Sequence, residues 1–301
     1  MAKATKQYTR EWRERLLSFF RDLPQRVFTQ TELRELIEGS KRKLGLPLSL
    51  TLGRAMPVLL AEGSLRKIEL PAAIDSKGLR RYPTIRRYAW GNVSPYALGL
   101  ALRKNAYLSH ASAIFLHGLT NQVPRTIYVN KEQTLKPRPS TALTQEGLDR
   151  AFRSPQRTSS YVFTNDDHRY VLLSGKQTNR LEVSDILGPS GEPLVATKLE
   201  RTLIDVVVRP TYGGGVFQVL EAFRQARDSV SINTLVAVLR KLDHVYPYHQ
   251  AIGFYMERAE YDSARLDRLK GLGLQYDFYL THQMTNPKYD AGWRLFYPEG
   301  F

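Results

Sequence analysis

The stretch Ser49–Trp90, SLTLGRAMPVLLAEGSLRKIELPAAIDSKGLRRYPTIRRYAW, decides the fold that we expect for the first third of the chain. From Leu52 onward, apolar residues recur at steps of three and four, which predicts a helix with one buried face. Ser49 is the expected N-cap, because its hydroxyl can accept from the free amides of the first turn. Two segments of strand composition follow, Leu65–Leu70 and Thr84–Trp90. A short helix followed by a basic hairpin is typical of a winged helix-turn-helix domain.

The polar side of the predicted helix carries Thr51 and Arg54 near its start. A recognition helix places its first turns in the major groove, so we expect Ser49, Thr51 and Arg54 to contact double-stranded DNA. Pro57 lies inside the same helix and lacks a backbone N–H. The helix is therefore expected to bend at Pro57 or to be split there.

Cations are concentrated in the hairpin and just before the helix. The tip and the return strand of the hairpin carry five of them: Lys77, Arg80, Arg81, Arg86 and Arg87. We expect these side chains to neutralise phosphates or to enter the adjacent minor groove. A basic run precedes the helix: Lys41, Arg42 and Lys43. For this run a phosphate contact and a solvated linker both stay open.

Two further helices are predicted upstream, as a three-helix winged domain requires. Thr9–Arg21 places Trp12, Leu16 and Phe20 on one face. The next helix starts at Thr29-Gln-Thr-Glu32, which is a capping box.

The net charge of +15 favours a polyanionic partner, either nucleic acid or an anionic membrane surface. Residues 1–92 hold 19 Lys and Arg against 9 Asp and Glu, and residues 93–301 hold 25 against 20. Two thirds of the excess thus lies in the first third of the chain, where the winged helix is predicted. This distribution favours DNA as the partner.

The 301 residues are enough for two domains, each with its own core. We expect a boundary near Gly91–Ser94, giving domains 1–92 and 93–301 and an α+β chain whose second part is a larger mixed α/β domain. No apolar run approaches the roughly 20 residues that cross a bilayer, and no signal sequence opens the chain. We therefore expect a cytoplasmic protein without membrane contact. The absence of cysteine excludes disulfides, thiolate nucleophiles and cysteine-ligated zinc.

The segment SHASAIFLHGLTNQVPRTIYVN, Ser109–Asn130, is compact and distinctive. Ser109 is the expected cap of a short helix that Gly118 closes as a left-handed C-cap. His110 and His117 are seven residues apart and share a helix face. Metal binding needs at least one more ligand, and none is evident nearby, so a core or capping role is favoured.

A second segment opens with Thr197-Lys-Leu-Glu200, which reads as another capping box. In the helix that it predicts, Arg201 and Asp205 are spaced i, i+4, as in a surface or interdomain ion pair. Tyr212-Gly-Gly-Gly215 lacks the lysine and the Ser or Thr of a phosphate-binding loop, so a connector between helices is favoured.

A catalytic constellation is not evident from spacing. Gly39-Ser40 is not followed by the Asp-x-Asp of a nucleotidyltransferase, and Asp166-Asp167 reads as a turn. We therefore expect no enzymatic activity and no cofactor or metal. The alternative from another class is a metal-dependent nuclease or nucleotide-modifying enzyme that a winged helix targets to its substrate.

The segment SHASAIFLHGLTNQVPRTIYVN together with KLERTLIDVVVRPTYGGGV resembles the AbiEi family of antitoxins from bacterial abortive-infection systems. The resemblance implies a winged-helix repressor that binds inverted repeats in its own promoter. It also implies a C-terminal domain that neutralises a toxin with a nucleotidyltransferase fold, by direct contact or without a stable complex. A third hypothesis makes toxin binding the main task and DNA binding secondary.

Overall fold

The structure is a computed structural model that describes residues 2–61, 64–74, 78–135 and 142–301, with only the backbone for residues 2–10. Lys77 lies outside the described residues. The chain is α+β and forms two compact units. Unit 1 comprises residues 1–104 and 163–169, and unit 2 comprises residues 105–162 and 170–301. The expected boundary at 92/93 lies before this division, which assigns the next helix to unit 1.

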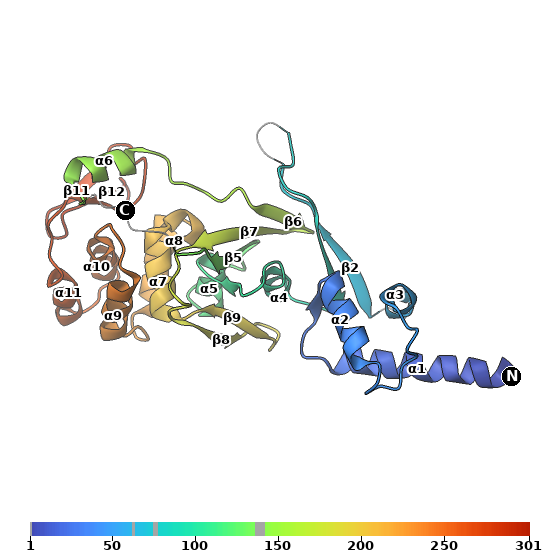
Figure 1. The fold of residues 1–301 in the computed structure, drawn as a ribbon. Helices are drawn as coiled ribbons and strands as arrows, with labels where there is room; N and C mark the ends of the chain where they lie inside the picture. The colour runs from blue at the N-terminus through green and yellow to red at the C-terminus, as the bar shows by residue number, and fades with distance from the viewer. Residues whose placement is uncertain (1, 62–63, 75–77, 136–141) are drawn as a thin grey trace. The chain divides into compact units, whose positions relative to one another are not determined.

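Unit 1 combines helices with a small antiparallel sheet in the strand order β1-β3-β2 (Figure 1). Its elements are α1 Ala2–Asp22, β1 Val27–Phe28, α2 Gln30–Ser40, α3 Leu52–Ala61, β2 Leu65–Leu70, β3 Ile85–Trp90 and α4 Pro95–Leu100. The register pairs Leu65 with Trp90 and Leu70 with Ile85. Both predicted strands of the hairpin are therefore present.

The predicted capping box at the start of α2 is confirmed. The Glu32 N–H donates to the Thr29 hydroxyl at 3.1 Å, and the Thr29 N–H donates to the Glu32 carboxylate at 2.7 Å. The apolar faces of the helices then meet in one core, where Phe20 stacks on Trp90 with ring centroids 5.6 Å apart. This core fixes α1, α2 and α3 against the sheet.

Helix α3 differs from its expected start. It begins at Leu52, and its first helical hydrogen bond runs from the Ala55 N–H to the Thr51 carbonyl at 3.0 Å. The expectation of Ser49 as its N-cap was wrong, because Ser49 lies in a turn closed by the Leu50 N–H on the Pro47 carbonyl. Pro57 lies within one continuous helix, with its ring exposed.

Most of the larger sheet belongs to unit 2, and its strand order is β6-β7-β5-β4-β9-β8. The strands are β4 Tyr107–Leu108, β5 Thr126–Glu132, β6 Val162–Asn165, β7 His168–Gly175, β8 Val183–Leu187 and β9 Pro193–Thr197. Strands β4 and β9 run parallel, with Leu108 opposite Ala196. Asp166 and Asp167 form the tight turn between β6 and β7, as predicted, and Asp166 has φ 48°.

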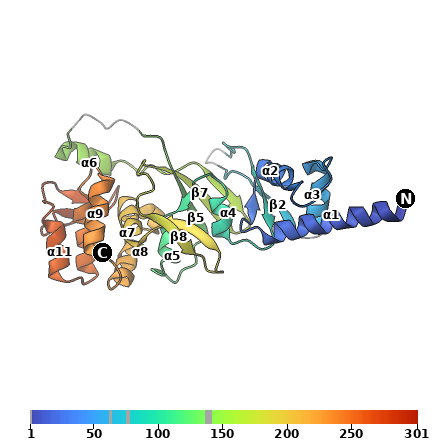
Figure 2. The same ribbon diagram turned by 60° about the horizontal axis from the view of Figure 1, so that its bottom comes forward.

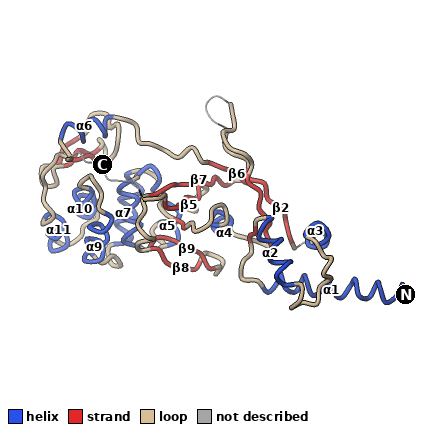
Figure 3. Tube along the Cα trace, in the orientation of Figure 1, coloured by secondary structure: helices blue, strands red, loops and turns tan. Residues whose placement is uncertain are grey.

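The remaining elements of unit 2 are mostly helices, mapped in Figure 3. They are α5 Ala111–Leu116, α6 Gln145–Arg153, α7 Leu199–Val208, the 3-10 helix η1 Pro210–Gly213, α8 Val216–Ala226, α9 Ile232–Leu242, α10 Tyr248–Arg258 and α11 Ser263–Lys270. A small sheet ends the chain, with β10 Phe278–Tyr279, β11 Lys288–Asp290 and β12 Leu295–Tyr297. Helices α9 and α11 lie side by side (Figure 2), and α10 contacts α11. Among the described residues, no helix combines the length and apolar character needed to cross a membrane.

The two distinctive sequence segments lie next to each other in unit 2. The β4–β9 pairing brings their starts together, and His117 Nε2 lies 2.7 Å from the Thr197 carbonyl oxygen. Leu203 of α7 and Ile114 of α5 belong to one core. Gly118 has φ 69° after α5, as its predicted left-handed position requires. Thus two segments about 80 residues apart form one structural element pair.

Two capping predictions in these segments were wrong. The N-cap of α5 is His110, and the Ser109 hydroxyl contacts the His110 ring instead. The N-cap of α7 is Lys198, which makes no side-chain capping bond. The Glu200 carboxylate accepts from the Ser231 N–H at 2.9 Å and so stabilises the start of α9. The expected connector role of Tyr212–Gly215 is confirmed, since η1 leads there directly into α8.

Candidate functional site

Five residues predicted to contact DNA have exposed side chains around the start of α3 and in the loop before it. They are Arg42, Lys43, Ser49, Thr51 and Arg54. Thr51 directly precedes α3, and Arg54 lies in its first turn. The second helix of the α2–α3 pair thus presents a hydroxyl and a guanidinium to solvent near its N-terminus. Such groups can donate to base edges or phosphates.

Lys41 has a different environment from its neighbours in the basic run. Its side chain is largely buried, and its ammonium group lies 2.6 Å from the Glu38 carboxylate. It also donates to the Leu48 carbonyl at 3.1 Å. Lys41 therefore fixes the loop between α2 and α3, and its charge is already compensated within unit 1.

The hairpin arginines divide into exposed and anchored side chains. Arg80, Arg81 and Arg86 are exposed. Arg80 donates to the Ala72 carbonyl at 2.8 Å, and Arg86 forms a solvent-exposed ion pair with Glu69 at 3.2 Å. Exposed pairs of this kind contribute little to stability, so Arg86 can exchange its partner at small cost.

Arg87 is the anchored member of the hairpin set. Its guanidinium donates to the carbonyls of Ala101 and Leu102 at 2.7 and 2.9 Å, at the end of α4. Burial lowers the pKa of this guanidinium from its usual value, although the group stays charged at neutral pH. The geometry therefore gives Arg87 a structural role within unit 1.

A second polar region lies entirely within unit 2, around a cavity of about 580 Å³. Four cationic side chains line this cavity: Arg157, Lys176, Arg201 and Arg209. The described lining also includes one carboxylate, Asp205, and two histidines, His110 and His244. We call this feature the basic cavity.

Arg201 and Asp205 form a buried ion pair at 2.8 Å, with the Arg201 side chain 6% and the Asp205 side chain 12% exposed. The predicted pairing is thus present, but its expected surface or interdomain position was wrong. The Arg201 guanidinium also donates to the Leu181 carbonyl at 3.0 Å. Burial raises the pKa of the Asp205 carboxyl above its ordinary value, and the neighbouring Arg201 charge opposes that rise.

His110 is buried, and its backbone has a positive φ that is unusual for a non-glycine residue, with φ 54° and ψ −132°. Its Nδ1 atom lies 2.8 Å from the Ser109 hydroxyl, and its ring meets Tyr212 edge-on at 5.4 Å. Burial and then the Arg209 and Arg201 charges lower the pKa of His110 to about 3. The ring is neutral at pH 7. Positive φ at a non-glycine residue costs about 1–3 kcal/mol and often marks functional sites.

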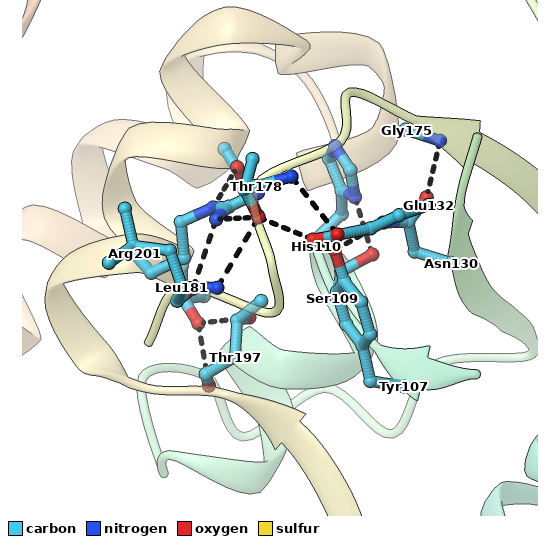
Figure 4. A network of polar contacts seen from close by, with 12 residues as sticks. Tyr107, Ser109, His110, Asn130, Glu132, Gly175, Thr178, Leu181, Thr197 and Arg201 are labelled. Atoms are coloured by element: carbon cyan, nitrogen blue, oxygen red, sulfur yellow. Dashed lines mark hydrogen bonds and ion pairs between the residues drawn. The ribbon is translucent and has the colours of Figure 1, made fainter. Parts of the chain in front are cut away.

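The segment that follows β7 is fixed by Glu132 and Asn130 (Figure 4). The Glu132 carboxylate accepts from the Thr178 N–H at 3.0 Å and contacts the Thr178 hydroxyl. Burial works to raise the pKa of Glu132, but the hydrogen bonds from Thr178 and the Arg180 N–H outweigh it, so the pKa is lowered. Asn130 donates to the Tyr107 hydroxyl at 2.6 Å and accepts from the Gly175 N–H at 2.9 Å. These bonds hold one wall of the basic cavity in place.

Sequence reasoning did not predict the basic cavity. The Arg201–Asp205 spacing was the available signal, but burial depends on β7, α7 and the loop after α9 meeting in space. Across the residues that the structure describes, no three His, Asp or Glu side chains gather as ligands of one metal ion would.

Comparisons with known proteins bear on the fold. No family model matches the chain, and no curated protein matches it. A solved structure titled "Crystal structure of RV2827C protein from Mycobacterium tuberculosis" is similar, with a TM-score of 0.56 and 17% sequence identity. The match covers 95% of this chain and 91% of that chain. The chain therefore shares its overall fold with this mycobacterial protein.

Proposed function

We propose that unit 1 is a winged-helix domain that binds double-stranded DNA. The order α1-β1-α2-α3-β2-β3 and the antiparallel β1-β3-β2 sheet support this proposal. In such a domain α3 is the recognition helix in the major groove. The observation that carries the proposal is the exposed pair Thr51 and Arg54 at the start of α3. Arg54 would read a base edge, and Thr51 would donate to a base or a phosphate.

We assign phosphate contacts to the predicted cationic side chains that are exposed to solvent. Arg42 and Lys43 lie in the loop before α3, and Arg80, Arg81 and Arg86 lie on the hairpin. Lys41 and Arg87 leave the proposed set, because their charged groups are held inside unit 1.

We further propose that the protein is an antitoxin of the AbiEi kind. In this proposal unit 1 represses the protein's own operon at inverted repeats. The C-terminal domain neutralises a nucleotidyltransferase-like toxin, and the protein works in the cytoplasm. The support is the resemblance of the two segments at 109–130 and 198–216, which the β4–β9 pairing makes neighbours. Such packing is what a shared family core would require.

The DNA proposal is tested by fluorescence anisotropy with a duplex from the protein's own promoter and a scrambled duplex of equal length. Arg54→Ala should weaken promoter binding more than scrambled binding, since one bidentate base contact is worth about 1–3 kcal/mol of discrimination. Arg150→Ala, which removes an exposed arginine on α6 of unit 2, is the matched control. Equal losses on both duplexes would reject Arg54 as a base-reading residue.

Phosphate contact is tested by salt dependence. Each neutralised phosphate adds about 0.9 to the slope of log affinity against log salt. The double variant Arg80→Ala, Arg81→Ala should therefore flatten the slope by about two and weaken both duplexes alike. An unchanged slope would remove these arginines from the interface.

The antitoxin proposal is tested by co-expression with a nucleotidyltransferase-like protein encoded in the same operon. Restored growth of toxin-expressing cells supports the proposal, and continued arrest contradicts it. Divalent-metal-dependent cleavage of DNA or RNA by the purified protein would instead favour the nuclease alternative.

A further inference from the structure

The two edges of the larger sheet differ in what borders them. The strand order ends in β6 on one side and in β8 on the other. At the β6 edge the Thr164 N–H donates to the Pro71 carbonyl at 3.0 Å, and Phe163 forms a bridge with Ala72. No described strand pairs with the outer side of β8, which lies at the margin of the sheet in Figure 1. The larger sheet can therefore be extended at β8.

The backbone of β8 directs alternate groups toward this open edge. Strand β8 pairs with β9 antiparallel and without a bulge over its full length. The Gly188 N–H donates to the Glu192 carbonyl at 2.8 Å, so the even-numbered residues of β8 exchange hydrogen bonds with β9. The N–H and C=O groups of Asp185 and Leu187 therefore point away from β9. Pro193 lies opposite Leu187 and has no N–H, which agrees with this register.

The composition of β8 leaves the edge unprotected. Edge strands in native proteins are usually shortened, bulged, covered or supplied with Lys or Pro, which prevents pairing with other chains. Val183–Leu187 contains no Lys, Arg or Pro, and it is the longest edge strand of the described structure without them. The Leu187 side chain is 72% exposed, and Asp185 is exposed as well. A regular, open edge with an exposed leucine is typical of a surface that takes up another strand.

We propose that β8 pairs with β8 of a second copy of this chain, so that two sheets become one across a two-fold axis. Such pairing is antiparallel and matches outward-pointing residues with each other. Asp185 opposite Asp185 would bring like charges together, which is unfavourable. The register with Ile186 opposite Ile186 avoids this, because it sets Asp185 opposite Leu187 of the second copy. Each such pair exchanges two main-chain hydrogen bonds, and the two-fold axis repeats the pair.

The same geometry favours a closed dimer. On the axis the two Ile186 side chains form a close, non-hydrogen-bonded pair, which is a favourable position for β-branched residues. The β6 edge is bordered by residues 71 and 72, so the larger sheet offers one open edge per chain and pairing ends at two copies. The dimer carries two copies of unit 1, as the two arms of an inverted repeat would require. The proposal itself rests on unit 2 and does not depend on DNA binding.

Sedimentation equilibrium of the full chain without DNA tests the proposal. We expect twice the mass of one chain at high concentration and a fall toward the single-chain mass on dilution. Leu187→Asp should weaken dimerisation at least about five-fold, because two like-charge pairs then face each other across the axis. Adding Asp185→Lys to this variant should restore the dimer, since each pair becomes oppositely charged. Both side chains are exposed, so these variants are expected to fold, and thermal unfolding checks this.

A matched control places the same charge elsewhere on unit 2. Val123→Asp introduces a carboxylate at another exposed apolar residue, which is 70% exposed, and should leave the mass unchanged. Equal weakening by Val123→Asp and Leu187→Asp would contradict pairing through β8.

Disulfide crosslinking tests the register. The chain has no cysteine, so one introduced cysteine can form a disulfide only with its equivalent in a second copy. Ile186→Cys should crosslink on oxidation, because Cα atoms of a non-hydrogen-bonded pair lie about 4.5 Å apart, within the range for a disulfide. Ser184→Cys lies on the same face of β8, but in this register it is roughly 13 Å from its equivalent and should not crosslink.

Three results would overturn the proposal. The first is a single-chain mass at every concentration tested, which would leave the edge to a strand of another protein. The second is a dimer that Leu187→Asp does not weaken. The third is equal crosslinking of Ser184→Cys and Ile186→Cys, which would place the contact between copies elsewhere.

Discussion

Removing the Asp205 carboxylate should strongly destabilise unit 2. In Asp205→Asn the Arg201 side chain, which is 6% exposed, stays buried and loses its ionic partner. Breaking a buried pair from one side costs about 3–5 kcal/mol. Arg201 keeps its hydrogen bond to the Leu181 carbonyl, so we expect the lower end, about 3 kcal/mol. For a unit of this size, the loss corresponds to a fall in melting temperature of roughly 6–12 °C.

Urea denaturation followed by circular dichroism measures this loss at pH 7. The matched control is Glu221→Gln, which breaks the exposed i, i+3 pair with Arg224 on α8. That pair should be worth less than about 1 kcal/mol. Replacing both buried partners, as in Arg201→Met with Asp205→Leu, should cost less than Asp205→Asn alone, because no unpaired charge remains. A loss below about 1 kcal/mol for Asp205→Asn, or a larger loss for the double variant, would refute the reasoning.

Three other predictions concern separate parts of the chain. Burial, followed by the Lys176 charge, lowers the pKa of His244 to about 4, so the unfolded chain binds more protons than the folded chain between pH 6.5 and 4. Stability should therefore fall on acidification from pH 7 to 5, and His244→Gln should reduce that fall by about 2 kcal/mol in urea titrations; an identical fall in both proteins would contradict this. A Cβ at Gly253 would lie 2.1 Å from the buried Trp293 ring, so Gly253→Ala should lower the free energy of unfolding by about 1–3 kcal/mol. A Cβ at Gly39 on α2 would meet nothing within 4 Å, so Gly39→Ala should be neutral or stabilising. Thermal melts measure both variants. Thr29→Ala should cost about 1 kcal/mol and Thr29→Ser much less, since serine keeps the capping hydroxyl; equal losses would show that the cap does not act through that bond.

Local sequence signals predicted much of unit 1. The Thr29 capping box and the strand at Leu65–Leu70 both appear where expected, because each depends on neighbours in the chain. The predicted start of α3 was wrong by two residues, because Ser49 and Thr51 are both good N-cap residues and the turn at Pro47 decides between them. The prediction of a capping box at the start of α7 was wrong for a different reason. The Glu200 carboxylate accepts a hydrogen bond from the Ser231 N–H, 31 residues away in the chain. The spacing of residues within the segment cannot predict such a distant partner.

The sequence predicted that unit 1 is rich in cations, but it did not predict which cationic side chains are exposed and which are held by hydrogen bonds. Charge counts identify a basic region but do not distinguish exposed Arg86 from anchored Arg87, its neighbour in β3. The distinction arises because alternate residues of a strand face opposite sides, and Arg87 meets the end of α4. Likewise, the i, i+4 spacing of Arg201 and Asp205 indicated an ion pair correctly but carried no information on burial. Burial is set by the packing of distant segments.

The grouping of residues 163–169 with unit 1 has a consequence for how the chain can be divided. The Thr164 N–H donates to the Pro71 carbonyl at 3.0 Å, and Phe163 bridges to Ala72. The chain therefore passes between the units at three points, after residues 104, 162 and 169. A single proteolytic cut cannot release unit 1 as a complete piece, and a fragment that ends at residue 104 lacks these partners of the hairpin. Gene fusion or exchange of unit 1 among related proteins would have to carry the β6–β7 turn with it.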